Sequence, residues 1–348
     1  MWCIGLAIML VSGQMPNNAT EFAINRGSLD NCRVKFTRDK SGHVVFMGGS
    51  ITEMEGYRPI MMEALKRRFP DTAFQFTNAG VASTCSTTGA FRLADEVLAK
   101  GPVDLIFVEF AVNDDQDAHH AKGQEPLSSG AHEEVAIRHN ISSAHVAREL
   151  AGKIKDGSFT WARYGGVHPA KPGNELAASV VERILEKSWT GPVPKTMAPH
   201  QAAQPLDPAS YSRAKFIENS SLTRGESWEL SVPAWKNLKG DCRVRFRSLP
   251  ILHSEKTGAT LTVPFAGRAL AAYLLAGPDA GVAEISIDGG SFKAMPLRHA
   301  YSKGLHYPRT VMLASDLEDK PHVATIRVGA SSAPMDGSAI RIIRLGVD

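Results

Sequence analysis

Residues 44–52 have the sequence VVFMGGSIT, which combines a buried-strand pattern with a glycine turn and a serine. Its first four residues are all apolar, which is typical of a strand buried on both faces of a parallel sheet. Gly48 and Gly49 then permit a sharp turn at the carboxyl end of that strand. From Tyr57 to Phe69 the apolar residues recur with a helical period. Ser50 is therefore expected on a strand-to-helix turn, at the edge where open α/β sheets bind their ligands.

Two interpretations of Ser50 are open at this point. A serine beside a helix start, where unpaired backbone N–H groups favour negative charge, is a candidate nucleophile. Serine is also among the residues preferred as a helix N-cap, and this stretch alone favours the cap. The rest of the chain changes that balance.

Further strands and helices alternate along the first half of the chain. Residues 73–77 and 103–112 are expected to form strands, and 91–98 and 174–189 are expected to form helices. This alternation predicts a parallel sheet with right-handed crossovers, in a flavodoxin-like three-layer α/β/α arrangement. Residues 115–130 are polar and carry no strand pattern, so either the sheet lacks a strand here or the sequence lacks a segment.

The chain of 348 residues is long enough for two domains. We expect an α/β domain over residues 21–190, a linker rich in Pro, Ala and Gln over 191–208, and a second domain over 209–348. In the second domain short strands follow one another and Asp288-Gly289 is a strong hairpin signal, which favours a jelly-roll-like β-sandwich. The net charge of +3 gives no reason to expect a nucleic-acid partner.

The segment from Trp2 to Val11 is almost wholly apolar. It is too short to cross a bilayer, which takes about 20 apolar residues, and no Lys or Arg precedes it. It resembles the hydrophobic part of a secretory signal, so residues 1–20 are a candidate signal segment. We expect an exported protein, periplasmic or extracellular, without stable membrane insertion; a buried N-terminal segment is the alternative.

Cysteine and histidine spacing gives no metal pattern. The four cysteines have no metal-ligand spacing and indicate no disulfide framework. His119 and His120 are adjacent but have no carboxylate–histidine spacing on a defined element. We therefore expect neither a metal nor a cofactor.

Four short blocks stand at the carboxyl ends of the expected strands or just before the last helix of the first domain. They are Gly-Gly-Ser-Ile-Thr at 48–52, Asn-Ala-Gly-Val-Ala-Ser at 78–83, Ala-Val-Asn-Asp at 111–114 and Val-His-Pro at 167–169. In this order they resemble the four sequence blocks of the SGNH, or GDSL-like, hydrolases. The resemblance covers residues 44–189, and four blocks in family order are more specific than any one alone.

The resemblance implies a serine esterase mechanism. Ser50 would attack the ester carbonyl, and His168 would act as its general base and then as the acid for the leaving alcohol. The backbone N–H groups of Ser50 and Gly80 and the side-chain amide of Asn113 would form the oxyanion hole. Gly49 and Asp114 occupy supporting positions.

Each of these residues also has an ordinary structural interpretation. Gly80 could form only a turn, Asn113 could stabilise its own loop as an Asx turn, and His168 could be a surface loop residue. Taken singly these interpretations are stronger, whereas taken together the four blocks favour a catalytic site.

The chain departs from the family pattern at three positions. Gly49 stands where the family has Asp, and Ala111 stands where it has Gly. Gly165 stands three residues before His168, where the family places the acid that orients the histidine. The expected constellation is therefore a Ser–His dyad, with a backbone carbonyl or a carboxylate from elsewhere holding the imidazole.

We expect an exported esterase that removes acyl groups, acetyl foremost, from a carbohydrate or another small ester. The second domain resembles the accessory β-sandwiches of carbohydrate-active esterases, on the pattern of residues 276–281 and 286–290. One alternative is a glycan-binding protein on a degenerate hydrolase scaffold, which Gly165 and the short middle region favour. Another alternative is an O-acyltransferase that uses the same serine.

Overall fold

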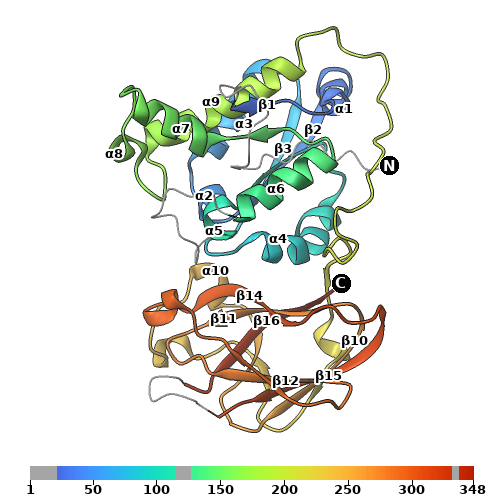
Figure 1. Cartoon of the computed structure of the whole chain (residues 1–348), viewed down its shortest axis with the longest axis vertical. Helices are drawn as coiled ribbons and strands as arrows, with labels where there is room; N and C mark the ends of the chain where they lie inside the picture. Colours follow the sequence, from blue (N-terminus) through green and yellow to red (C-terminus); the bar gives the residue numbers. More distant parts are fainter. Residues whose placement is uncertain (1–21, 115–126, 331–336) are drawn as a thin grey trace. The chain divides into compact units, whose positions relative to one another are not determined.

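The computed structural model describes residues 22–114, 127–330 and 337–348. The candidate signal segment (1–20), His119 and His120 lie outside the described residues. The chain divides into two compact units, one within residues 1–89 and 96–210 and the other within 90–95 and 211–348 (Figure 1). In the part of the chain that the structure describes, no helix is both long and apolar enough to cross a membrane.

The first unit contains the predicted parallel sheet. Its three strands are β2 (Ser41–Gly48), β3 (Ala73–Gly80) and β4 (Leu105–Glu109), in the order β3-β2-β4. Gly48 is the register partner of both Gly80 and Glu109, so the three strands end in one row at their carboxyl edge. The strand expected over 103–112 ends earlier, because the chain turns into the short helix α5 (Ala111–Asp114).

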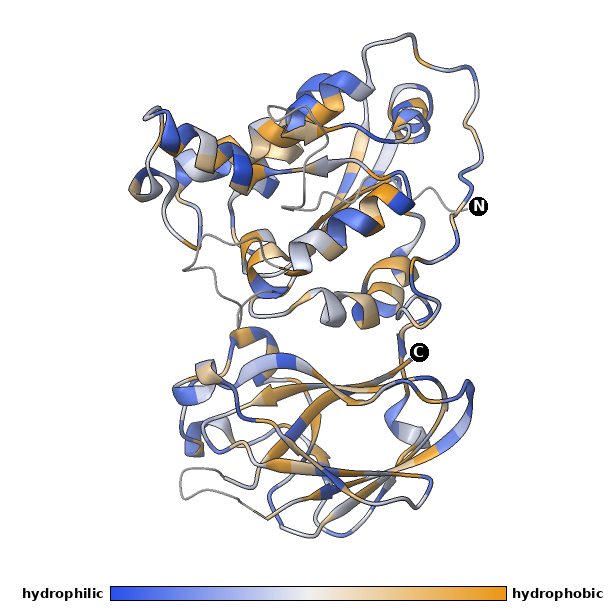
Figure 2. Ribbon diagram, viewed as in Figure 1, coloured by the Kyte–Doolittle hydropathy of each residue, from blue (hydrophilic) through white to orange (hydrophobic). Residues whose placement is uncertain are grey.

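Helices lie on both faces of this sheet, as the three-layer prediction requires. Val44 and Phe46 of β2 belong to a core that also contains residues of α3 (Tyr57–Arg68) and α9 (Lys171–Ser188). Met47 points to the other face, where a Cβ on Gly89 of α4 (Ser86–Arg92) would lie 3.5 Å from its methyl group. Figure 2 shows hydrophobic residues along the strands and a mixture of both kinds on the helices.

The other elements that lie wholly in the first unit are β1 (Ala23–Ile24), α1 (Asp30–Val34), η1 (Lys35–Asp39), α2 (Ser50–Glu53), η3 (Leu98–Lys100), α6 (Leu127–Arg138), β5 (Ser143–Ala144), α7 (Val146–Lys155) and α8 (Trp161–Tyr164). The division between the units falls within α4 and within η2 (Leu93–Val97), because residues 90–95 belong to the second unit. Among the described residues no further strand joins the parallel sheet after β4; β5 pairs with β1 instead, antiparallel.

The second unit is the predicted β-sandwich of two antiparallel sheets. One sheet has the order β13-β12-β15-β10-β7, and the other has the order β14-β11-β16-β9-β8 with β6 paired to β16. Its core consists of alternate strand residues such as Leu261, Leu274, Ile326 and Leu345. The elements are β6 (Lys215–Phe216), η5 (Asn219–Ser221), β7 (Thr223–Arg224), β8 (Glu229–Ser231), η6 (Trp235–Asn237), α10 (Val244–Arg247), β9 (Ile251–Ser254), β10 (Thr260–Gly267), β11 (Leu270–Ala276), β12 (Val282–Ile287), β13 (Lys293–Pro296), η7 (Ala300–Lys303), β14 (Tyr307–Ala314), β15 (Lys320–Val328) and β16 (Ile340–Val347).

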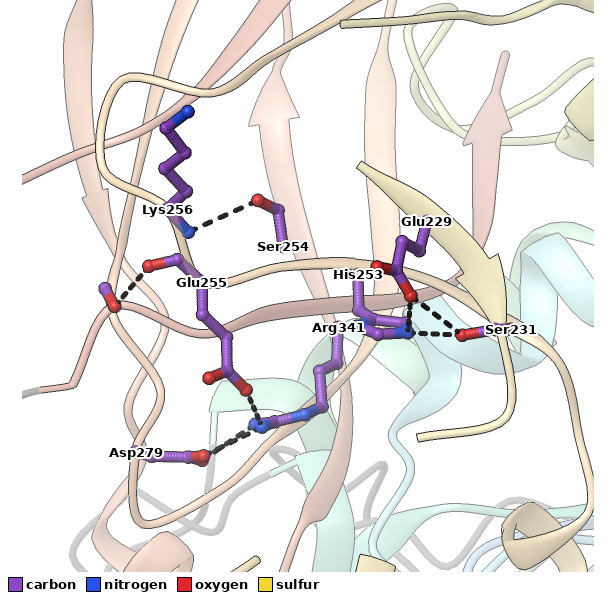
Figure 3. Close-up of polar contacts among 9 residues, drawn as sticks. Glu229, Ser231, His253, Ser254, Glu255, Lys256, Asp279 and Arg341 are labelled. Atoms are coloured by element: carbon purple, nitrogen blue, oxygen red, sulfur yellow. Dashed lines mark hydrogen bonds and ion pairs between the residues drawn. The ribbon is translucent and has the colours of Figure 1, made fainter. Parts of the chain in front are cut away.

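The sandwich contains a buried arginine side chain that is paired with two carboxylates. Arg341 on β16 is 1% exposed, and its guanidinium donates to both carboxylate oxygens of Asp279 at 2.7 and 2.8 Å and to Glu255 at 2.6 Å (Figure 3). A buried charge without such partners would cost several kcal/mol, so these two acids account for an arginine inside the sandwich.

An aromatic cluster closes the core of the first unit between η1, β3 and the end of α9. Phe36 is fully buried, with its ring centroid 5.4 Å from that of Phe69 and 5.0 Å from that of Phe74. We predict that Phe36→Ala lowers the free energy of unfolding of this unit by about 3–5 kcal/mol, because it removes buried area and leaves a cavity. Urea denaturation followed by tryptophan fluorescence measures this.

The matched control is Ile137→Ala on α6, since Ile137 is 59% exposed. It should change the unfolding free energy by no more than about 0.5 kcal/mol. Equal effects of the two substitutions would contradict this description of the core.

Candidate active site

Ser50 and His168 lie in hydrogen-bond contact. Ser50 is the first residue of α2, and its Oγ is 2.8 Å from His168 Nε2. The turn before it is closed by the Gly49 N–H, which donates to the carbonyl oxygen of Glu109 at 3.1 Å. Ser50 is half-buried and His168 is exposed, so the pair is open to a ligand. Residues 118 positions apart are thus brought together, as a nucleophile and its base require.

The His168 loop is held by its own backbone. Helix α8 ends at Tyr164 with Gly165 as its C-cap, and the Ala170 N–H donates to the carbonyl oxygen of Tyr164 at 2.7 Å, which closes the loop around His168. The side-chain amide of Asn174 donates to the Pro169 carbonyl at 2.7 Å and is buried. The loop that carries the imidazole is therefore tied to the start of α9 on one side and to α8 on the other.

The position where the family places its acid cannot hold a side chain here. Gly165 has φ +104°, and a Cβ at this residue would overlap the backbone nitrogen of Ala170. No carboxylate of the described residues contacts the second ring nitrogen of His168, Nδ1. The closed loop thus explains why the usual third member of a triad is missing at this place.

Asn113 lies directly against the Ser50 turn. It is buried, and a Cβ on Gly49 would overlap its Oδ1. This contact explains the glycine at position 49, because an aspartate there would displace the Asn113 amide. Oδ1 is buried without a partner, and no described residue accepts a hydrogen bond from Nδ2.

Gly80 also approaches the Ser50 helix closely. A Cβ on Gly80 would overlap the backbone nitrogen of Glu53, so only glycine allows β3 and α2 to pack this tightly. Its N–H, which was expected to face an oxyanion, donates to Asn78 Oδ1 at 2.9 Å. Asn78 also donates from Nδ2 to the Glu53 carbonyl at 3.2 Å. An oxyanion would therefore have to share or replace the Asn78 acceptor.

Asp114 has a supporting position, away from the Ser50–His168 contact. Its Oδ1 accepts a hydrogen bond from the Ser86 N–H at 2.6 Å, and its Oδ2 lies 2.9 Å from His132 Nε2. These contacts fix the short helix that carries Asn113 against α4 and α6. No sequence pattern singles out His132, which comes to lie beside Asp114 only through the tertiary fold.

Glu109 is a buried carboxylic acid behind the Ser50 turn, which the sequence analysis did not single out. It is 3% exposed at the end of β4, and its burial raises the pKa of the carboxyl group to about 7. The sequence feature that could have indicated a buried acid is its place directly after the apolar residues 105–108 of the expected strand.

The described residues contain no cluster of side chains suited to bind a metal ion. No group of three or more His, Cys, Asp or Glu side chains there is placed to hold an ion. Cys32, Cys85 and Cys242 form no disulfide among the residues that the structure describes.

Comparisons with known proteins identify the fold. No family model and no curated protein matches the sequence. Two solved structures of a two-domain esterase active on acetylated mannans match with a TM-score of 0.75. The one co-crystallised with mannopentaose is 20% identical and is matched over 95% of this chain and 97% of its own; the other is 18% identical, over 95% and 98%. A family two carbohydrate esterase from Cellvibrio japonicus is 13% identical and matches over 38% of this chain and 32% of its own, with a TM-score of 0.27.

At these identities the likeness establishes the fold. The chain has the architecture of a two-domain esterase, which confirms the predicted α/β/α domain followed by a β-sandwich. The roles of Ser50, His168, Gly80 and Asn113 stay predictions.

A carboxylate introduced at position 165 should lower the stability of the folded protein and should not increase its activity. We predict that Gly165→Asp lowers the free energy of unfolding by about 1–3 kcal/mol more than Gly166→Asp does. Both glycines have positive φ, +104° and +83°, but a Cβ on Gly166 meets nothing within 4 Å. The difference between the variants therefore isolates the overlap with Ala170. Urea denaturation measures it, and equal destabilisation would show that the loop opens freely.

Proposed function

We propose that the protein is a serine esterase that removes acetyl groups from a carbohydrate by means of Ser50 and His168. The observation that carries this proposal is the 2.8 Å contact between Ser50 Oγ and His168 Nε2 at the carboxyl edge of the sheet. The neighbours that share the two-domain fold are esterases active on acetylated mannans, which favours an acetylated polysaccharide as substrate.

The first half of the reaction forms an acyl-enzyme. The Ser50 hydroxyl donates its proton to Nε2 of His168 while its oxygen attacks the ester carbonyl carbon. The negative charge on the former carbonyl oxygen is stabilised by the Ser50 N–H, the Asn113 amide and the Gly80 N–H once this last group leaves Asn78. The imidazolium then gives its proton to the sugar oxygen as the C–O bond breaks.

The second half releases the acid. Water gives a proton to His168 and its oxygen attacks the carbonyl carbon of the acetyl-serine. The second tetrahedral intermediate then collapses as the imidazolium returns the proton to Ser50 Oγ, which breaks the acyl C–O bond and releases acetic acid. Without a carboxylate on Nδ1, the closed loop between Tyr164 and Ala170 positions the backbone that carries His168, and the ring itself contacts Ser50. An acyltransferase would differ only in this half, where a sugar alcohol would replace water.

Substitution of Ser50 tests the proposal directly. Ser50→Ala should reduce acetate release from acetylated mannan and from p-nitrophenyl acetate by about 10³-fold or more, because no other group can form the acyl-enzyme. Ser158→Ala, at an exposed serine, is the control and should retain full activity. Equal activity of Ser50→Ala and the wild type would refute the mechanism, and glycan binding with no turnover by the wild type would favour the binding-protein alternative.

Asn113 offers a test of the oxyanion hole that preserves shape. Asn113→Asp keeps the size of the side chain but replaces its N–H donors with a charge, so kcat should fall by about 10²–10³-fold. KM should change much less, because the interaction develops in the transition state. Asn113→Ala should give a similar loss, and a loss of less than tenfold in both variants would remove Asn113 from the oxyanion hole.

Export of the protein stays a proposal as well. It rests on the apolar segment from Trp2 to Val11, which lies outside the described residues. Recovery of the expressed full-length protein from the cytoplasm alone, with residues 1–20 still attached, would contradict it.

A further inference from the structure

Glu109 joins the sheet to the Ser50 turn. Its carbonyl oxygen accepts the Gly49 N–H at 3.1 Å, and a Cβ on Gly48 would overlap that same oxygen. Glu109 is also the register partner of Gly48 across the β2–β4 pair. The backbone of this one residue therefore sets the course of the chain immediately before the nucleophile.

The side chain of Glu109 has little to stabilise a negative charge. Its Oε2 is 3.4 Å from Thr52 Oγ1, a long hydrogen bond, and Thr52 Oγ1 lies 3.1 Å from the hydroxyl of Tyr57. Its Oε1 is buried without a hydrogen-bond partner. The Ala111 backbone N–H and the Thr52 hydroxyl both stabilise the ionised form, but burial outweighs them and the pKa is raised. A neutral carboxylic acid in this place costs less than a carboxylate.

The charged groups around Glu109 do not compensate such a charge. Asp114 on α5 repels it and His132 on α6 attracts it, but these two side chains are 2.9 Å apart and their effects oppose each other. Arg58 on α3 donates to the Thr52 carbonyl and to Glu55. No Lys or Arg of the described residues pairs with the Glu109 carboxylate.

Glu109 is also electrostatically coupled to the segment that carries the base. Tyr164 is the last residue of α8, and its carbonyl closes the His168 loop. Burial and the negative charge of Glu109 together raise the pKa of Tyr164 to about 12. Burial, followed by Glu109, also raises the pKa of Tyr57. One acid thus adjoins the helix of Ser50, the helix of Asn113 and the loop of His168.

We propose that Glu109 positions the Ser50–His168 pair and that it acts in this role as a neutral carboxylic acid. Ionisation of this side chain places an uncompensated charge beneath α2, and relief of that charge requires Thr52, Tyr57 or water to move. Such movement shifts the Ser50 turn relative to His168. The kinetic part of this inference rests on the proposed esterase function.

The pH profile of kcat/KM should reveal this role. An imidazole base must be neutral, so its contribution makes activity rise with pH. Ionisation of Glu109, whose pKa burial raises to about 7, should then make activity fall by about tenfold per pH unit at higher pH. Glu109→Gln keeps the shape and stays neutral, so it should remove this fall and hold activity constant up to pH 9. Most of the change should appear in kcat.

Glu186→Gln is the matched control, an exposed acid on α9 that should leave the bell-shaped profile intact. Thr52→Val provides a second variant if Glu109→Gln does not fold. The Thr52 hydroxyl lowers the pKa of Glu109, so its loss should move the fall to higher pH. A wild-type profile without any fall up to pH 9, or the same fall in Glu109→Gln, would overturn the inference.

Two measurements remain informative if the protein proves to have no esterase activity. Because the pKa of Glu109 is higher in the folded state, the free energy of unfolding should decrease as pH rises from about 4.5 to about 7, and Glu109→Gln should lessen that decrease. In NMR spectra the His168 Cε1–H signal, assigned with His168→Ala, should show a second inflection near pH 7 that Glu109→Gln removes. Unchanged stability and a single inflection in both proteins would refute the coupling whatever the activity.

Discussion

The Ser50–His168 contact depends on three parallel strands whose carboxyl ends are in register, two of which end in glycine. Gly48, Gly80 and Glu109 are register partners, so the segments that follow β2, β3 and β4 begin side by side. Glycine at positions 49 and 80 lets Asn113 and the backbone of α2 pack where a Cβ would otherwise stand. A site of this kind is built by close approach of backbones, and it tolerates substitution at those glycines poorly.

The same principle governs the imidazole. In a Ser–His–Asp triad a carboxylate holds the histidine. Here the Ala170 N–H and the Tyr164 carbonyl close a short loop around His168, and that closure excludes any side chain from position 165. The backbone positions the loop, and the imidazolium receives no stabilisation from a carboxylate of the described residues. Catalysis by this pair would therefore depend more on the oxyanion donors and on a neutral interior behind Ser50.

The sequence was sufficient for the features that depend on local pattern. The apolar run before Gly48, the helix over 174–189 and the hairpin at Asp288-Gly289 each have a short-range physical cause, and the structure confirms them. Four blocks in family order were enough to choose Ser50 and His168, which lie in contact. The strand expected over 103–112 was too long, because apolar residues at 110–112 continue into a helical turn that packs against the sheet edge.

Features that arise from packing between distant segments could not be predicted. Asn78 accepts a hydrogen bond from the Gly80 N–H, His132 contacts Asp114, and Glu109 is buried only in the folded unit. None of these contacts has a spacing rule in the sequence. They determine whether the oxyanion donors are already hydrogen-bonded within the protein and whether the buried Glu109 side chain is charged or neutral.

The activation of Ser50 by His168 can be tested by mass spectrometry of the native protein after treatment with a fluorophosphonate, which reacts with serines activated by a neighbouring base. We predict one added phosphonyl group per chain, located on the peptide that contains Ser50, and no addition to His168→Ala. An unmodified wild-type protein, or modification at a different serine, would contradict it.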